Sequence, residues 1–129
     1  YKGGIVPLRE YAERPYDRDI LVRLIVKKEA AEFFYQSVRN SQTDIPVLTC
    51  AAARLQDGRF RFAVGARPLK AVLFEMPAAP AQQLAEDIRQ QVVTGSNMRG
   101  SAAYRRHLTG VLVRRAAQEL ENRALQEET

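Results

Sequence analysis

The dipeptide Asp57-Gly58 constrains the fold of this chain more than any other short segment. It separates two apolar runs, residues 47–55 and residues 59–66. A two-residue type I′ turn needs positive φ at both central positions, which Asp-Gly tolerates, so we predict a β-hairpin closed by this turn. In the second run apolar side chains alternate with arginines, as expected when one face of a strand meets the core and the other meets water. The pattern therefore predicts an antiparallel sheet.

Three further segments are predicted to extend this sheet. Residues 19–28 have one wholly apolar and one mixed face, which is typical of a half-buried strand. Residues 29–39 favour a helical turn at their start and a strand at their end, and we predict extended structure around residues 34–38. Residues 69–75 form another short strand, and the polar residues 40–44 supply a loop. The result is an antiparallel sheet of about four strands.

Two helices are predicted to follow the strands. The first covers residues 80–93, where Pro80 suits an initial helical turn and an apolar stripe follows. The second begins near Ser101, a suitable N-cap, and ends near residue 125. Its apolar stripe consists of Tyr104, Leu108, Val111, Leu112, Ala116, Leu120 and Ala124. Gly110 lies inside this helix at a cost of about 1 kcal/mol relative to alanine, so we expect a helix or strand to approach closely there.

The order of these elements predicts the fold class and the domain organisation. Strands followed by helices indicate an α+β fold, with the antiparallel sheet packed against the two C-terminal helices. Residues 1–18 are polar and contain two glycines and two prolines, so we interpret them as an extended arm or linker from a preceding domain. Residues 19–129 form the C-terminal α+β domain. The chain starts at Tyr1 and not at methionine, which leaves open that it is part of a longer polypeptide.

Composition narrows the classes of protein to which the chain can belong. The net charge is +5, but 20 basic residues are interleaved with 15 acidic ones, which favours a solvated surface and leaves a nucleic-acid-binding domain as an alternative. No apolar run approaches the roughly 20 residues that span a bilayer, so no membrane span is expected. Cys50 is the single cysteine, best explained by core packing, and no signal peptide opens the chain. These features predict a cytoplasmic protein.

Residues that carry out catalysis are scarce. His107 is the only histidine and there is one cysteine, so a multi-histidine or thiolate metal site is excluded. The chain has no Gly-x-Ser-x-Gly elbow and no glycine-rich phosphate loop. We therefore predict no catalytic and no metal-binding residue. The pairs Arg105-Arg106 and Arg114-Arg115 could clamp a phosphate or carboxylate, but neighbouring helical residues diverge by about 100°, which favours structural salt bridges or solvated positions.

Residues 100–120 read GSAAYRRHLTGVLVRRAAQEL, and this pattern carries a family resemblance. It resembles the C-terminal domain of the FAD-binding subunit of molybdenum hydroxylases, the xanthine dehydrogenase, carbon monoxide dehydrogenase and aldehyde oxidase relatives. Family members show Ser-Ala-x-Tyr-Arg-Arg-x-Leu followed by Val-Leu-Val-Arg-Arg-Ala. The matching residues are Ser101, Tyr104, Arg105, Arg106, Leu108, Val111, Leu112, Val113, Arg114, Arg115 and Ala116.

Three other stretches extend the resemblance. Residues 34–54 are similar to a family segment with an aromatic residue, a lysine, arginines and Asp-Ile-Ala before an apolar strand. Residues 57–68 resemble the family's Asp-Gly hairpin and the glycine loop that follows it, and residues 13–26 are similar to the strand leading out of the flavin domain. The resemblance thus covers residues 13–117.

The resemblance implies a supporting role in electron transfer by an oxidoreductase. In such enzymes a molybdenum cofactor oxidises the substrate, iron–sulfur clusters relay electrons, and FAD passes them to an acceptor. FAD lies mainly in the two preceding domains, so the full-length subunit is expected to hold it and this chain alone is not expected to bind it tightly. The implied partners are the preceding FAD-binding domain and the molybdopterin and iron–sulfur subunits.

The resemblance also implies three flavin-side positions, Gln36, Arg39 and Asp44. Arg39 and Asp44 match the family, whereas Gln36 replaces a lysine, Asn40 an arginine and Pro46 an alanine. A neutral amide cannot offset charge on a reduced flavin. A second hypothesis is therefore a free-standing interaction module of the same fold without flavin. An excised domain would expose the apolar surface that meets its flavin-binding partner, or bury it by self-association.

Overall fold

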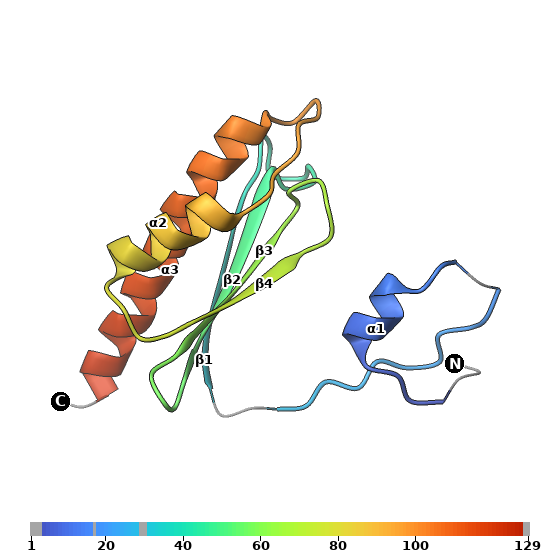
Figure 1. The fold of residues 1–129 in the computed structure, drawn as a ribbon, viewed down its shortest axis with the longest axis horizontal. Helices are drawn as coiled ribbons and strands as arrows, with labels where there is room; N and C mark the ends of the chain where they lie inside the picture. Colours follow the sequence, from blue (N-terminus) through green and yellow to red (C-terminus); the bar gives the residue numbers. More distant parts are fainter. Residues whose placement is uncertain (1–3, 17, 29–30, 128–129) are drawn as a thin grey trace.

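The protein is built around a four-stranded antiparallel sheet, with strands in the order β1-β2-β3-β4. The computed structural model describes residues 4–16, 18–28 and 31–127 (Figure 1). The strands are β1 (Ala31–Val38), β2 (Leu48–Leu55), β3 (Phe60–Gly65) and β4 (Val72–Met76). Each strand pairs with the next in sequence, so the sheet is a meander. The predicted α+β fold with about four strands is confirmed.

Two helices cover one face of this sheet (Figure 1). They are α2 (Ala81–Gln91) and the long α3 (Ala102–Glu127), close to the predicted spans. Ser101 Oγ accepts a hydrogen bond from the Tyr104 N–H at 3.1 Å, which confirms the predicted N-cap. The other face of the sheet carries no helix among the described residues.

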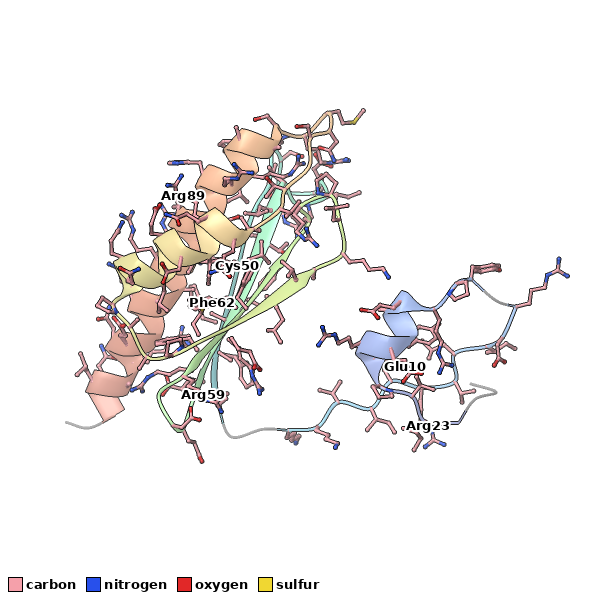
Figure 2. All side chains as sticks on the ribbon, in the orientation of Figure 1. Glu10, Arg23, Cys50, Arg59, Phe62 and Arg89 are labelled. Atoms are coloured by element: carbon pink, nitrogen blue, oxygen red, sulfur yellow. The ribbon has the colours of Figure 1, made fainter. Side chains whose placement is uncertain are left out.

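The core lies between the sheet and the two helices, where Figure 2 places Cys50 and Phe62. Cys50 is fully buried, and burial raises the pKa of its thiol to about 12, which confirms that it packs in the core. The largest fully buried apolar side chains are Phe62, Leu48, Leu84, Ile88, Leu112, Leu120, Val47, Val64, Val92 and Val113. Tyr104, predicted on the core stripe of α3, is instead 46% exposed, whereas the next residue, Arg105, is fully buried.

The two helices approach each other closely at Gly110. A Cβ atom on this glycine would lie 3.1 Å from Cδ of Arg89 in α2, which is tighter than an ordinary carbon contact. The close approach predicted from Gly110 is therefore confirmed, and its partner is a helix.

The hairpin forms where predicted, but the predicted two-residue type I′ turn is wrong. Gln56, Asp57 and Gly58 all lie in the loop, because Leu55 and Arg59 face each other and the Leu55 N–H donates to the Arg59 carbonyl at 2.9 Å. Gly58 has φ of +82°, whereas Asp57 does not have positive φ. The loop is thus a three-residue turn that ends in a left-handed glycine. The Asp57 carboxylate accepts the Arg59 N–H at 3.0 Å, which stabilises this longer loop.

The prediction of a strand over residues 19–28 is wrong. Its described residues run without pairing to any strand, and Ile20 and Val26 are 74% and 85% exposed. A strand needs a neighbour for its backbone N–H and C=O groups, and this segment leads away from the sheet in Figure 1. The alternating residues therefore have no paired strand among the described residues. By contrast, β1 confirms the extended structure predicted around residues 34–38 and begins earlier, at Ala31.

The N-terminal arm contains a short helix, α1 (Leu8–Glu13), where an extended or turning path was predicted. Pro7 stands at its N-cap, a position that proline tolerates, and an ion pair joins Glu10 to Arg14 one turn later. Lys70 Nζ donates to the Ala12 carbonyl, which connects α1 to the loop before β4. Residues 1–3 and 17 of the predicted arm lie outside the described residues.

The left-handed glycine of the hairpin gives a first testable prediction. Gly58→Ala should reduce the free energy of unfolding by about 1 kcal/mol, because alanine is strained at positive φ while the space around Gly58 is open. Urea unfolding should show a lower midpoint at an unchanged slope. Gly58→Asn is the matched control and should lose less, because asparagine tolerates this conformation. Equal stability of the alanine variant and the parent would contradict the assignment.

Candidate functional site

The candidate site lies at the end of the sheet where β1 ends and β2 begins. Residues 39–46 connect these strands, and the Val47 N–H donates to the Val38 carbonyl at 2.7 Å to close the loop. Residues 92–101 connect α2 to α3 and reach the same end. Within this second loop Asn97 and Gly100 exchange hydrogen bonds, both at 3.1 Å. The two loops meet side by side, since the Asn40 side chain donates to the Arg99 carbonyl at 3.4 Å.

Asp44 is the acidic group of this site. Its Oδ1 accepts hydrogen bonds from Arg99 Nε at 3.2 Å and Nη2 at 3.1 Å, and from the Ile45 N–H at 2.7 Å. These contacts, that from the Arg99 side chain first, hold the pKa of Asp44 below its usual value. Arg39 Nη1 donates to the backbone carbonyl of Asp44 at 2.6 Å. Two of the three predicted flavin-side residues, Arg39 and Asp44, are therefore brought together.

Gln36 lies elsewhere, on the face of β1 that meets the helices. Its Nε2 donates to the backbone carbonyl of Leu112 in α3 at 2.6 Å. This hydrogen bond joins the edge strand β1 to α3 and uses a donor of the Gln36 side-chain amide. Its neighbour Tyr35 points to the opposite face of the sheet, because successive side chains alternate along a strand.

Arg105 holds the two loops in place from inside the protein. The residue is fully buried, and its guanidinium donates to four acceptors. These are the carbonyl of Val47 at 2.9 Å, that of Gly95 at 2.8 Å, that of Gly100, and Asn97 Oδ1 at 2.6 Å. Burial lowers the pKa of Arg105, with nearby Arg99 as a second cause, but an arginine stays charged at neutral pH.

Sequence reasoning missed this role, because it favoured salt bridges or solvated positions for both arginine pairs. Arg105 forms no ion pair with a described residue, and carbonyl groups satisfy it instead. Its neighbour Arg106 is exposed. A signal was present in the sequence: Arg105 stands three residues before Leu108 and seven before Leu112, so it belongs to the buried stripe of α3. An arginine on an apolar stripe indicates a buried cation with designated acceptors.

The uncovered face of the sheet is the second notable surface. Strand register places Phe33 and Tyr35 of β1 beside small alanines of β2 and β3, with Leu73 on β4 at the other edge. Phe33, Tyr35 and Leu73 are 62%, 60% and 55% exposed. Exposed apolar side chains gathered on one face commonly mark an interaction surface. We name this surface of Phe33, Tyr35, Ala51, Ala53, Ala63 and Leu73 the outer face; the Arg61–Glu75 ion pair lies on it as well.

The potential metal ligands and catalytic groups are scattered among the described residues. No three histidine, cysteine, aspartate or glutamate side chains are grouped there so that they could hold a metal ion. His107 borders a hollow between α2 and α3, and its side chain forms no ion pair or hydrogen bond with another described residue. No helix in this part of the chain is both long and apolar enough to cross a membrane.

The buried guanidinium gives the second prediction. Arg105→Lys should lower the free energy of unfolding by about 3 kcal/mol, because lysine cannot reach all four acceptors and leaves buried carbonyls without donors. Thermal or urea unfolding would measure the loss. Arg106→Lys is the control at the adjacent exposed position and should change stability by less than about 0.5 kcal/mol. Similar losses in the two variants would contradict the special role of Arg105.

Comparisons with known proteins agree with this fold. Residues 66–120, which include α2, the following loop and Arg105, match the family model described as "CO dehydrogenase flavoprotein C-terminal domain". The uncharacterised YgfM proteins of Escherichia coli K12 and O157:H7 are each 27% identical over 114 residues, which make up 86% of this chain and 44% of theirs. The chain therefore spans less than half the length of these relatives.

A solved structure shares the fold. The crystal structure of quinoline 2-oxidoreductase from Pseudomonas putida 86 superimposes with a TM-score of 0.61 at 19% identity, over 74% of this chain and 39% of that chain. The common region is the four-stranded sheet with its C-terminal helices. The match over residues 66–120 shows that this part of the chain is similar to the CO dehydrogenase flavoprotein C-terminal domain, and the solved structure shows that the fold is shared.

Proposed function

We propose that this chain is the C-terminal scaffold and interface domain of the FAD-binding subunit of a molybdenum-dependent oxidoreductase of the xanthine or aldehyde dehydrogenase type. The observation that carries the proposal is the flavoprotein family match over residues 66–120, found in a fold that leaves one apolar sheet face uncovered. The domain supports electron transfer by positioning the flavin-binding part of the subunit, and it contributes no catalytic residue. We expect it to work in the cytoplasm beside molybdopterin and iron–sulfur subunits.

The outer face is the surface that we propose to meet the FAD-binding domain. The relatives are more than twice as long as the matched segment, so they contain further chain that can cover such a face. Residues 18–28 support the same arrangement, because their alternating side chains suit a strand whose partner lies in a neighbouring domain. Together with α1 they surround an open hollow of about 880 Å³, lined mainly by apolar residues. This hollow indicates a segment whose packing partner is missing.

FAD, when bound by the whole subunit, accepts an electron pair and passes it to an acceptor. The residues of this chain fit a peripheral contact with it and not an enclosed site, because the Asp44 carboxylate is already engaged by Arg99. Arg39 and Asp44 lie on an open loop at the sheet end, where we propose that they border the flavin. The third proposed position, Gln36, would act by holding β1 against α3 through Leu112.

A flavin-free interaction module of the same fold is the second candidate. The observation that favours it is the neutral Gln36, whose amide is engaged with a backbone carbonyl and cannot offset negative charge on a reduced flavin. The two candidates differ in whether FAD binding appears when the chain is joined to its upstream part.

A flavin titration tests this difference. The chain alone should show no sub-micromolar FAD binding, because no phosphate-binding loop is present in its sequence. The full-length subunit should bind FAD tightly, as measured by quenching of flavin fluorescence. Tight binding by the isolated chain would overturn the scaffold role, and failure of the full-length subunit to bind FAD would favour the flavin-free module.

A charge placed on the outer face should weaken docking. Tyr35→Glu is expected to weaken association with the FAD-binding domain by about tenfold or more, because it puts a carboxylate into an apolar contact. Isothermal titration of the separately produced domains would measure the affinity. Gln118→Glu adds the same charge on the exposed side of α3 and should have no effect. Both variants should melt like the parent chain, since Tyr35 is largely exposed; unchanged affinity of Tyr35→Glu would refute the docking surface.

A further inference from the structure

The groove between α2 and α3 lies on the side of the helices that faces away from the sheet, where Figure 2 labels Arg89. It encloses a hollow of about 220 Å³. Its lining comes from both helices and consists of Gln82, Ala85, Glu86, Arg89, His107, Gly110, Val111 and Arg114. Gly110 opens the groove, because any side chain at this position would occupy the space in front of Arg89. The groove belongs neither to the outer face nor to the loops around Asp44.

The lining of the groove carries more positive than negative side chains. Glu86 is the only carboxylate in its lining, and it is fully engaged: Arg89 donates to it at 3.0 and 2.7 Å, and Gln90 at 2.8 Å. These hydrogen bonds, with that of Arg89 first, lower the pKa of Glu86 to about 2, so its charge persists at neutral pH and is offset by Arg89.

Two further arginines of α3 lie near the groove. Arg114 lines the groove one helical turn after Gly110, and Arg106 stands one turn before Gly110 on the same helix, just outside the lining. Both are exposed, and no ion pair joins either to a described residue. His107, also exposed, lies on the same side. The groove therefore has one unpaired guanidinium group in its lining, that of Arg114, and a second, that of Arg106, nearby on α3, whereas its own carboxylate is neutralised by Arg89.

We propose that this groove docks an acidic segment of a partner protein, with carboxylates of the segment pairing with Arg106 and Arg114. Charge complementarity favours this occupant, because a carboxylate can bind a guanidinium fork bidentately. Val111, which is half-buried, adds apolar surface beside Arg114, which a protein segment can cover and a small ion cannot. The backbone N–H groups along the groove are inside helices and already bonded, so they are not available to enclose a free phosphate.

The chemistry of the groove also sets how such docking should behave. Ion pairs between exposed side chains are individually weak and are screened by salt. They act mainly on the rate and orientation of association. The proposed contact should therefore weaken as ionic strength rises. It does not depend on flavin and can be tested on the chain alone.

The probe is a synthetic 15-residue helical peptide with glutamates spaced four residues apart, labelled for fluorescence anisotropy. The parent chain should bind it at low salt, and amide chemical shifts should change along α2 and the first half of α3. The double variant Arg106→Gln/Arg114→Gln should lose about fivefold in affinity. The control Arg9→Gln/Arg115→Gln removes the same charge outside the groove and should keep the affinity of the parent chain.

Three results would overturn the proposal. The first is the absence of peptide binding. The second is an equal loss of affinity in both double variants, which would show that the peptide responds only to the net charge of +5. The third is displacement of the peptide by inorganic phosphate with the same chemical-shift changes, which would make the groove a small-anion site. Melting curves of all variants should coincide, because the substituted arginines are exposed.

Discussion

One buried guanidinium organises the end of the molecule where the candidate site lies. Arg105 projects from the first turns of α3 and binds carbonyls at the start of β2 and in the loop before the helix. Because a buried cation must have its hydrogen bonds satisfied, the loop can adopt few other conformations. The same loop supplies Arg99, which pairs with Asp44 in the opposite loop. The position of Asp44 therefore depends on a residue that does not touch it.

Most of the fold could be predicted from local patterns. An apolar run before Asp57-Gly58 predicted β2 and alternation predicted β3. An N-cap and an apolar stripe predicted α3, and Gly110 indicated the close approach of a helix or strand. The errors have physical causes. Asp57-Gly58 fits two kinds of hairpin loop, which are distinguished by the hydrogen bonds of Leu55 with Arg59 and Gly58 and by the φ of Asp57. The alternation of residues 19–28 was real, but a strand is defined by its neighbour, and none is present in the described chain.

The candidate site was less predictable, because it depends on contacts between distant segments. Arg39 and Asp44 share a loop, so their proximity follows from short sequence separation. The hydrogen bond between Asp44 and Arg99 joins residues that are 55 positions apart in the sequence, so it could not be inferred from composition or periodicity. The family resemblance proposed Gln36 as a flavin-side residue, yet strand alternation alone assigns it to one face of β1, and only packing shows that this face meets α3. The flavin roles of all three remain predictions.

The outer face also has a shape that follows from where its side chains of different size lie. Its apolar residues of large size, Phe33, Tyr35 and Leu73, stand on the two edge strands. The central strands carry alanines and one long side chain, Arg61 of β3, which pairs with Glu75 of β4 at 2.8 Å. At Gly65 a side chain is excluded altogether, because a Cβ would lie 2.6 Å from Thr49 Oγ1. The face is thus low only around Ala51, Ala63 and Gly65, with Tyr35 and Leu73 on either side and Arg61 at one end. A flat partner would leave a void over these small residues, so good packing requires a partner that inserts apolar side chains there and leaves room for the Arg61–Glu75 ion pair.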